Sequence, residues 1–193
     1  MTTQIMNNLP DFIVCKDSVY SLYRVYIIFT AQKIPLWTPL LRLGLRHYQG
    51  TKVTYTHSLI ALVDLQQEAI YWYEMDFSRG MAVYQSEYDT VHYEGNTLTV
   101  GYDTFYGGTE EETYTAVDVT THVTNTELNE RWNEYLTDER LTPWSLLKHL
   151  TPANPNKITW TCSGLTEALL TGDAYRCYIS PKSPDQLLYT LTH

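Results

Sequence analysis

Residues 157–170 read Lys-Ile-Thr-Trp-Thr-Cys-Ser-Gly-Leu-Thr-Glu-Ala-Leu-Leu, a short apolar approach followed by a cysteine and a helical pattern. The apolar side chains after the cysteine have the i, i+3, i+4 spacing of one helix face, at Leu165, Ala168 and Leu169. Cys162 lies three residues before Leu165 on the same face. The sequence therefore predicts a helix that begins at or just after Cys162.

A cysteine at the start of a helix has an unusual electrostatic environment. The unpaired backbone N–H groups and the positive end of the helix dipole both stabilise a thiolate, which lowers the thiol pKa and makes the sulfur more nucleophilic. Free cysteines are also among the residues most often buried in protein cores. Cys162 is therefore either a buried structural residue or a nucleophile, and the second interpretation requires a base elsewhere in the chain.

Composition limits the class of protein. With 193 residues the chain is predicted to form a single domain, 1–193, that is large enough for a substantial core. Its formal net charge of -9 argues against a nucleic-acid partner or an anionic membrane surface, since either would repel it. The 17 tyrosines favour a fold with much β-structure.

The three cysteines, Cys15, Cys162 and Cys177, lack the spacing of metal ligands and cannot all pair with one another. We therefore expect free thiols and no bound metal. The N-terminus lacks the basic start and apolar run of a signal peptide, and the run 26–29 is too short to span a bilayer. These features predict a soluble chain with no signal peptide and no transmembrane segment.

Most of the predicted strands come before most of the predicted helices, an order typical of an α+β fold, with a central antiparallel sheet packed against helices. Residues 1–10 are predicted to be a loosely ordered lead. Predicted strands cover 19–29, 53–63, 69–75, 81–84, 97–102, 114–117 and 174–179. Predicted helices cover 39–48, 126–136, 143–150 and 186–191, in addition to the helix that follows the cysteine.

The two strands at 53–63 and 69–75 form a predicted hairpin. A four-residue loop at 64–67 would pair Val63 with Glu68, and counting back along the ladder then places His57 opposite Glu74. Directly opposed residues project from the same face of a sheet, with Cβ atoms roughly 4.5–5.5 Å apart. The pairing depends on the loop length, because a slip of one residue would send the two side chains to opposite faces.

These residues match the requirements of a cysteine nucleophile. The thiol needs a base, for which histidine is suited by its near-neutral pKa, and the base needs a group that orients it. We predict Cys162 as nucleophile, His57 as base and Glu74 as the carboxylate that fixes the imidazole tautomer. The alternative for His57 is a strand histidine whose hydrogen bonds are satisfied within a Thr- and Tyr-rich sheet.

Three segments resemble the circularly permuted branch of the NlpC/P60 papain-like cysteine hydrolases. They are Tyr-Thr-His-Ser-Leu-Ile-Ala-Leu at 55–62, Tyr-Glu at 73–74 and Trp-Thr-Cys-Ser-Gly-Leu at 160–165. In that branch a histidine on an early strand is followed by a polar residue on the next strand and by a cysteine at a helix start near the C-terminus. The likeness covers roughly residues 25–190 and implies a papain-like fold, in which the longer segment 86–125 would be a β-rich insert.

The resemblance implies acyl transfer by Cys162, His57 and Glu74, with no cofactor and no metal. Family members cleave peptidoglycan peptides or other amides, so the implied substrate is a peptide or a peptidoglycan-like molecule. Together with the expected lack of a signal peptide, this suggests a phage-encoded enzyme, found in the host cytoplasm or in the phage particle. Two alternatives remain: a non-enzymatic protein that contacts other virion proteins through 86–125, and an acyltransferase or thioesterase acting on lipids.

Overall fold

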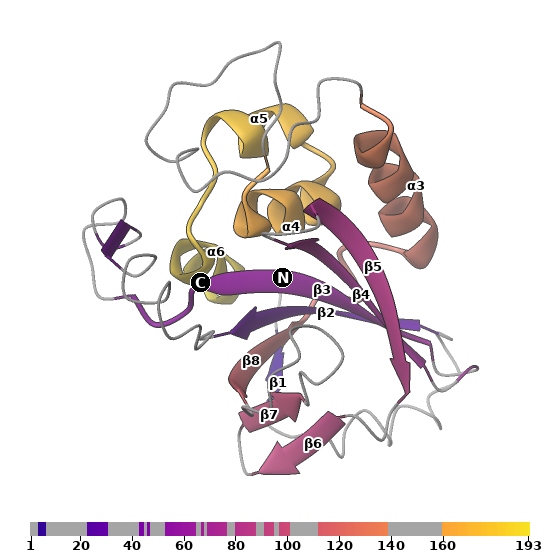
Figure 1. The fold of residues 1–193 in the computed structure, drawn as a ribbon, viewed down its shortest axis with the longest axis vertical. Helices are drawn as coiled ribbons and strands as arrows, with labels where there is room; N and C mark the ends of the chain where they lie inside the picture. Colours follow the sequence, from indigo (N-terminus) through magenta and orange to yellow (C-terminus); the bar gives the residue numbers. More distant parts are fainter. Residues whose placement is uncertain are drawn as a thin grey trace.

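The chain has an α+β fold in which helices cover an antiparallel sheet, as the computed structural model shows (Figure 1). The structure describes residues 4–6, 23–30, 43–44, 46, 53–64, 67, 69–76, 80–87, 91–94, 97–100, 112–138 and 160–193. The predicted helix at 143–150 lies outside these residues, and of the predicted helix at 39–48 only residues 43, 44 and 46 are described, all helical.

The described strands form one sheet in the order β5-β4-β3-β2-β8-β7-β6, and each neighbouring pair is antiparallel. Their bounds are β1 (Gln4–Met6), β2 (Tyr23–Thr30), β3 (His57–Asp64), β4 (Ala69–Asp76), β5 (Gly80–Glu87), β6 (Val91–Glu94), β7 (Thr97–Val100) and β8 (Glu112–Asp118). β1 lies off this path and pairs with β8. The strands within 86–125 therefore extend the sheet outward from β2.

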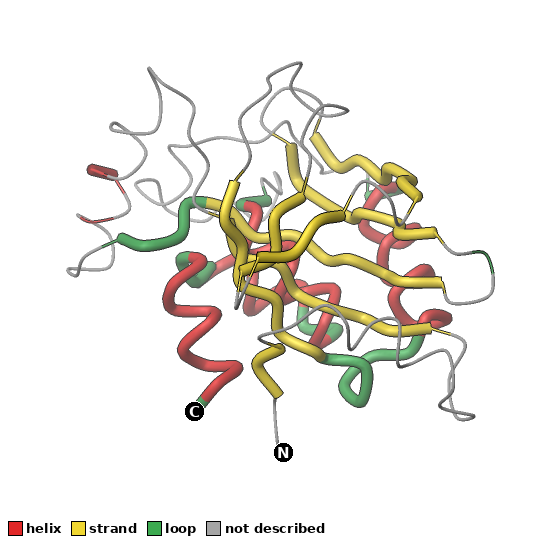
Figure 2. Tube along the Cα trace, turned by 90° about the horizontal axis from the view of Figure 1, so that it is seen from below, coloured by secondary structure: helices red, strands yellow, loops and turns green. Residues whose placement is uncertain are grey.

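The helices lie on one face of the sheet (Figures 1 and 2). They are α3 (Asn125–Leu136), α4 (Cys162–Thr171), α5 (Ala174–Ile179) and α6 (Pro184–Thr192). Alternate strand residues such as Ile27, Ile60 and Tyr73 join apolar side chains of all four helices in one buried cluster. This alternation follows from the two-residue period of a strand, which directs every second side chain to the same face.

α4 is at the centre of this arrangement and contacts β3, β4 and the other three helices. Residues 163–170 of this helix are all buried, so other parts of the protein surround it on most sides. Its sequence accordingly has only a modest amphipathic pattern. Arg131 of α3 donates hydrogen bonds to the carbonyl oxygens of Leu169 and Leu170 at 2.7 and 2.8 Å. These bonds satisfy carbonyl groups that the last turn of a helix leaves unpaired.

Two predictions of secondary structure are wrong. Residues 174–179 form helix α5 instead of a strand, because Gly172 ends α4 at a φ of 75° and Asp173 caps the next turn by accepting a hydrogen bond from Arg176 N at 3.1 Å. Residues 4–6, predicted as part of a loosely ordered lead, form β1 against β8. Local capping in the first case and a long-range pairing in the second outweigh the intrinsic residue preferences.

The register of the β3–β4 hairpin also differs from the prediction. Val63 pairs with Ile70 and not with Glu68, because the four-residue loop begins one residue later than expected. Asp64 belongs to the strand, and its Oδ1 accepts a hydrogen bond from Gln67 N at 2.9 Å, which stabilises the turn. The resulting shift is two residues, so each side chain keeps the sheet face that the prediction gave it.

Candidate active site

Cys162 is the first residue of α4 and is half-buried. Thr161 precedes it as the N-cap, and its hydroxyl accepts a hydrogen bond from Gly164 N at 3.0 Å. The first N–H groups of a helix have no partner within the helix, so those of Cys162 and Ser163 remain available to the sulfur or to a bound molecule. The predicted helix start at the cysteine is confirmed.

Gly164 lets the start of α4 approach its neighbours closely. A Cβ atom at this position would lie 2.8 Å from Thr161 Oγ1 and 3.3 Å from both Cys177 O and Pro181 Cβ. Any larger residue would therefore disturb either the N-cap or the contact with α5. Gly164 thus has a steric role in placing the start of the helix that carries Cys162.

His57 is the first residue of β3 and its Nε2 lies 3.1 Å from Glu74 Oε2. The paired part of the hairpin joins Ile60–Asp64 to Ala69–Tyr73, so both residues lie beyond it. Continuing this register would place Leu59, and not His57, opposite Glu74, so the predicted direct pairing is wrong. The two side chains meet diagonally across the strands, within the reach of long side chains.

Glu74 is almost completely buried, with a side-chain exposure of 0%. Within the described part of the chain, its second carboxylate oxygen, Oε1, has no hydrogen-bond partner. A buried carboxylate with one paired oxygen is costly, since desolvation penalises the charge. This arrangement is not one that stability alone would favour.

Cys162 and His57 interact directly. Burial lowers the pKa of His57, but the charge of Cys162 and a hydrogen bond to it, together with the hydrogen bond and charge of Glu74, outweigh burial and raise the pKa to about 10. Burial raises the pKa of Cys162, but the charge and hydrogen bond of His57 and the backbone N–H groups of Ser58 and Ser163 outweigh it and lower the pKa. Both directions favour a thiolate–imidazolium pair.

A carboxylate on α6 holds the segment that leads into His57. Asp185 accepts a hydrogen bond from Thr54 N at 2.9 Å through Oδ2 and one from Tyr55 N at 3.0 Å through Oδ1. Asp185 lies in the first turn of α6, whose N-cap Ser183 forms a capping box with Gln186. The C-terminal helix is therefore tied to the histidine strand across 131 and 130 residues of sequence.

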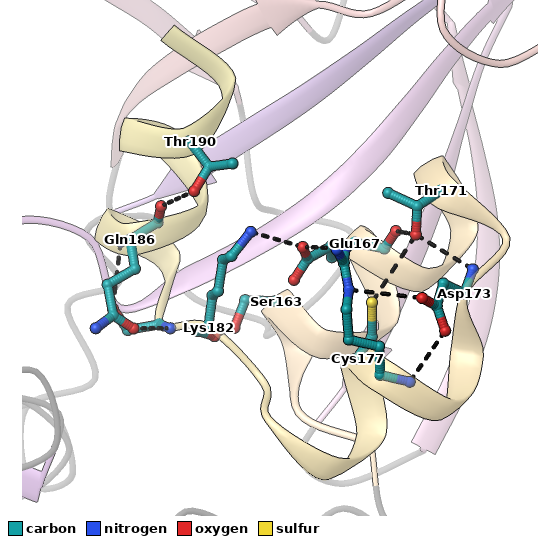
Figure 3. A network of polar contacts seen from close by, with 10 residues as sticks. Ser163, Glu167, Thr171, Asp173, Cys177, Lys182, Gln186 and Thr190 are labelled. Atoms are coloured by element: carbon teal, nitrogen blue, oxygen red, sulfur yellow. Dashed lines mark hydrogen bonds and ion pairs between the residues drawn. The ribbon is translucent and has the colours of Figure 1, made fainter. Parts of the chain in front are cut away.

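A second buried carboxylate lies on α4 itself, on the side of α5 and α6 (Figure 3). Glu167 Oε1 accepts hydrogen bonds from Lys182 Nζ at 2.7 Å and from Arg176 Nη2 at 2.9 Å. Ser163, next to the cysteine, donates to the carbonyl oxygen of Lys182. These contacts fix the helix that carries Cys162 against α5 and the connection to α6.

The structure brings together the three residues predicted for the site, Cys162, His57 and Glu74. Cys177 is buried in α5, where burial raises the pKa of its thiol, and Cys15 lies outside the described residues. Four polar residues that support the site are not predicted from the sequence: Ser58, Thr166, Glu167 and Asp185. Asp185 directly precedes the predicted helix at 186–191, where an acidic residue is favourable, but this signal does not identify Thr54 and Tyr55 as its partners.

In the described part of the chain, no group of three or more His, Cys, Asp or Glu side chains is arranged to hold a metal ion. None of the described helices is long and apolar enough to cross a membrane. Comparisons with protein-family models, with curated proteins and with solved structures find no match to this chain. Any assignment of function therefore rests on the arrangement of Cys162, His57 and Glu74.

Proposed function

We propose that this protein is a cysteine hydrolase that cleaves amide bonds, with Cys162 as nucleophile, His57 as general acid and base, and Glu74 as the group that orients His57. The observation that carries the proposal is the position of His57, which is buried between a helix-start cysteine and a buried carboxylate at 3.1 Å. Nucleophile, base and orienter in this order are the requirements of covalent acyl transfer. A papain-like, permuted NlpC/P60 fold is part of the proposal.

The first half-reaction forms an acyl-enzyme. The Cys162 thiolate attacks the carbonyl carbon of the amide, and the carbonyl π electrons move to the oxygen to give a tetrahedral intermediate. The N–H of Cys162, one of the first-turn donors that have no acceptor within the helix, would donate to this oxygen. The intermediate collapses when the C–N bond breaks and the His57 imidazolium gives its proton to the leaving amine, leaving a thioester on Cys162 and a neutral imidazole.

The second half-reaction releases the acid. Neutral His57 takes a proton from a water molecule, and the resulting hydroxide attacks the thioester carbonyl carbon. The C–S bond breaks, the carboxylic acid leaves, and the thiolate–imidazolium pair is restored. Because Nε2 of His57 contacts Glu74, the other ring nitrogen, Nδ1, is the one that serves the sulfur and the water.

A substrate panel tests this function. Purified protein is incubated with peptidoglycan, with a series of peptide amides and with lipid esters, beside a Cys162→Ala variant. The proposal predicts cleavage of amides by the wild type alone, and an acyl adduct on Cys162 that mass spectrometry detects after rapid quenching. Turnover of lipid esters alone would show that the protein is a lipid acyltransferase or thioesterase and not an amidase. No turnover and no adduct with any member of the panel would contradict an enzymatic role.

A further inference from the structure

One residue on α4 links the cysteine to the histidine strand without belonging to the proposed catalytic set. Thr166 lies one turn after Cys162, and its Oγ1 donates a hydrogen bond to Cys162 O at 2.9 Å. The same hydroxyl lies 3.3 Å from Ser58 O, and Ser58 Oγ donates to it at 3.5 Å. Thr166 and Ser58 are both buried, so water does not compete readily for these contacts.

The contact between Thr166 and Ser58 matters because Ser58 is also bonded to Cys162. Ser58 follows His57 directly in β3, and its backbone N–H is hydrogen-bonded to Cys162. The carbonyl oxygen of the same residue meets Thr166. Ser58 is therefore held by α4 at both its N–H, through Cys162, and its C=O, through Thr166, one residue after His57.

We propose that Thr166 is a positioning residue, whose hydroxyl holds Ser58 against the first turn of α4 so that the Ser58 N–H donates to the Cys162 sulfur. This inference rests on the proposed function and deepens it, because it names a residue that sets the reactivity of the nucleophile without touching a substrate. A threonine hydroxyl has a single hydrogen, which here is shared between two carbonyl oxygens on different elements. Loss of the hydroxyl would remove this hydrogen bond between α4 and β3 next to the site.

Thr171 provides a matched control on the same helix. Its hydroxyl also bonds back to the carbonyl four residues earlier, Glu167 O at 2.9 Å. Its other contacts are with Asp173 N and the sulfur of Cys177, away from β3. Substitution of either threonine by valine removes one such bond within α4, but only the substitution at 166 removes a link to Ser58.

The test is the pH profile of Cys162 alkylation by iodoacetamide in the full chain, followed peptide by peptide with mass spectrometry. Thr166→Val is expected to shift the profile to higher pH and to slow labelling at pH 6.5 about tenfold, which corresponds to one pKa unit. Thr166→Ser, which keeps the hydroxyl, should restore the rate to within about threefold of wild type, as should Thr171→Val. Thr166→Ala gives the same readout if the valine variant does not fold.

An unchanged profile in Thr166→Val or Thr166→Ala, with a wild type that labels rapidly at pH 6.5, would overturn the positioning role while leaving the proposed hydrolase intact. Equal shifts in the Thr166→Val and Thr171→Val variants would also overturn it, since a general loosening of α4 would then be the cause. A wild-type Cys162 that labels only above the ordinary thiol pKa of about 8.5 would overturn both the inference and the proposed function.

Discussion

Two glutamates, Glu74 and Glu167, are buried in this protein with side-chain exposures of 0% and 4%, and they are paired in different ways. Glu167 meets two cations, Lys182 and Arg176, both of which donate to Oε1. Glu74 meets one histidine through Oε2, and its Oε1 has no partner in the described part of the chain. One carboxylate is thus held by permanent charges and the other by a group whose charge depends on a third residue.

The contacts of Glu167 are structural, whereas the pair of Glu74 and His57 is suited to proton transfer. Lysine and arginine remain charged at neutral pH, so the contacts of Glu167 tie α4 to its neighbours under all ordinary conditions. Within the described part of the chain, the partner of Glu74 is His57, whose positive charge is favoured by Cys162, and such a chain of polar groups is suited to moving a proton. Substitutions at matched positions in the two regions should therefore affect different measurements.

Removal of the imidazole is expected to have the largest effect. His57→Gln keeps a donor for Glu74 but cannot accept or release the proton, so turnover of the amide identified in the panel should fall roughly 10²–10⁴-fold. Lys182→Gln is the matched control, since it removes a partner of Glu167, and its turnover should stay near wild type. Retention of more than about a third of wild-type turnover in His57→Gln would exclude His57 as the base.

Glu74→Gln should have the next largest effect on turnover. The amide cannot supply the charge that helps to raise the pKa of His57, so the imidazolium would lose its proton at lower pH than in the wild type. The alkaline limb of the kcat/KM profile should move down in pH, and the rate at neutral pH should fall about 10–100-fold, the range found when a carboxylate that orients a metal-binding histidine is removed. An unmoved alkaline limb would remove Glu74 from the site.

Glu167→Gln applies the same substitution to the other buried carboxylate. It weakens two charge-assisted hydrogen bonds, so the free energy of unfolding from urea denaturation should fall by about 1–3 kcal/mol. Turnover at a temperature where the variant is folded should match the wild type. A loss of turnover as large as that of Glu74→Gln, without a loss of stability, would reverse the roles assigned to the two residues.

Arg176→Gln should have the smallest effect. The arginine side chain is 56% exposed, and Lys182 would remain 2.7 Å from the carboxylate. Exposed ion pairs contribute little, so the free energy of unfolding should fall by less than about 1 kcal/mol, and less at high salt. A larger loss, independent of salt, would indicate that packing of the arginine stem contributes more than its charge.

The residues of the candidate site could be predicted from the sequence for two reasons. The signal for Cys162 is local, and the signal for His57 and Glu74 tolerates an error of two residues in the strand register. The helix start at Cys162 follows from apolar spacing within a few residues. The contact between His57 and Glu74 was placed with a register wrong by two residues, yet an even shift keeps both side chains on the same face of the sheet. A loop shifted so as to change the register by one residue would have separated them.

The supporting contacts could not be predicted, since they join segments far apart in the chain. Thr166 meets Ser58 across 108 residues, and Asp185 meets Tyr55 across 130. Neither contact leaves a pattern in a single sequence, because polar side chains on a helix are usually solvated. The wrong prediction of a strand at 174–179 has a different cause. A run rich in aromatic residues favours a strand, but the capping by Asp173 stabilises a helix.

The central claim is that His57 activates Cys162, and the direct test is the pH dependence of Cys162 alkylation in the wild type and in His57→Gln. The lowered pKa of Cys162 means that the thiolate persists below the ordinary thiol value of about 8.5, so the wild type should label rapidly at pH 6–7. His57→Gln removes the cation that stabilises the thiolate and should move the profile to higher pH. Identical profiles for the two proteins, or labelling of Cys162 only in denaturant, would contradict the account.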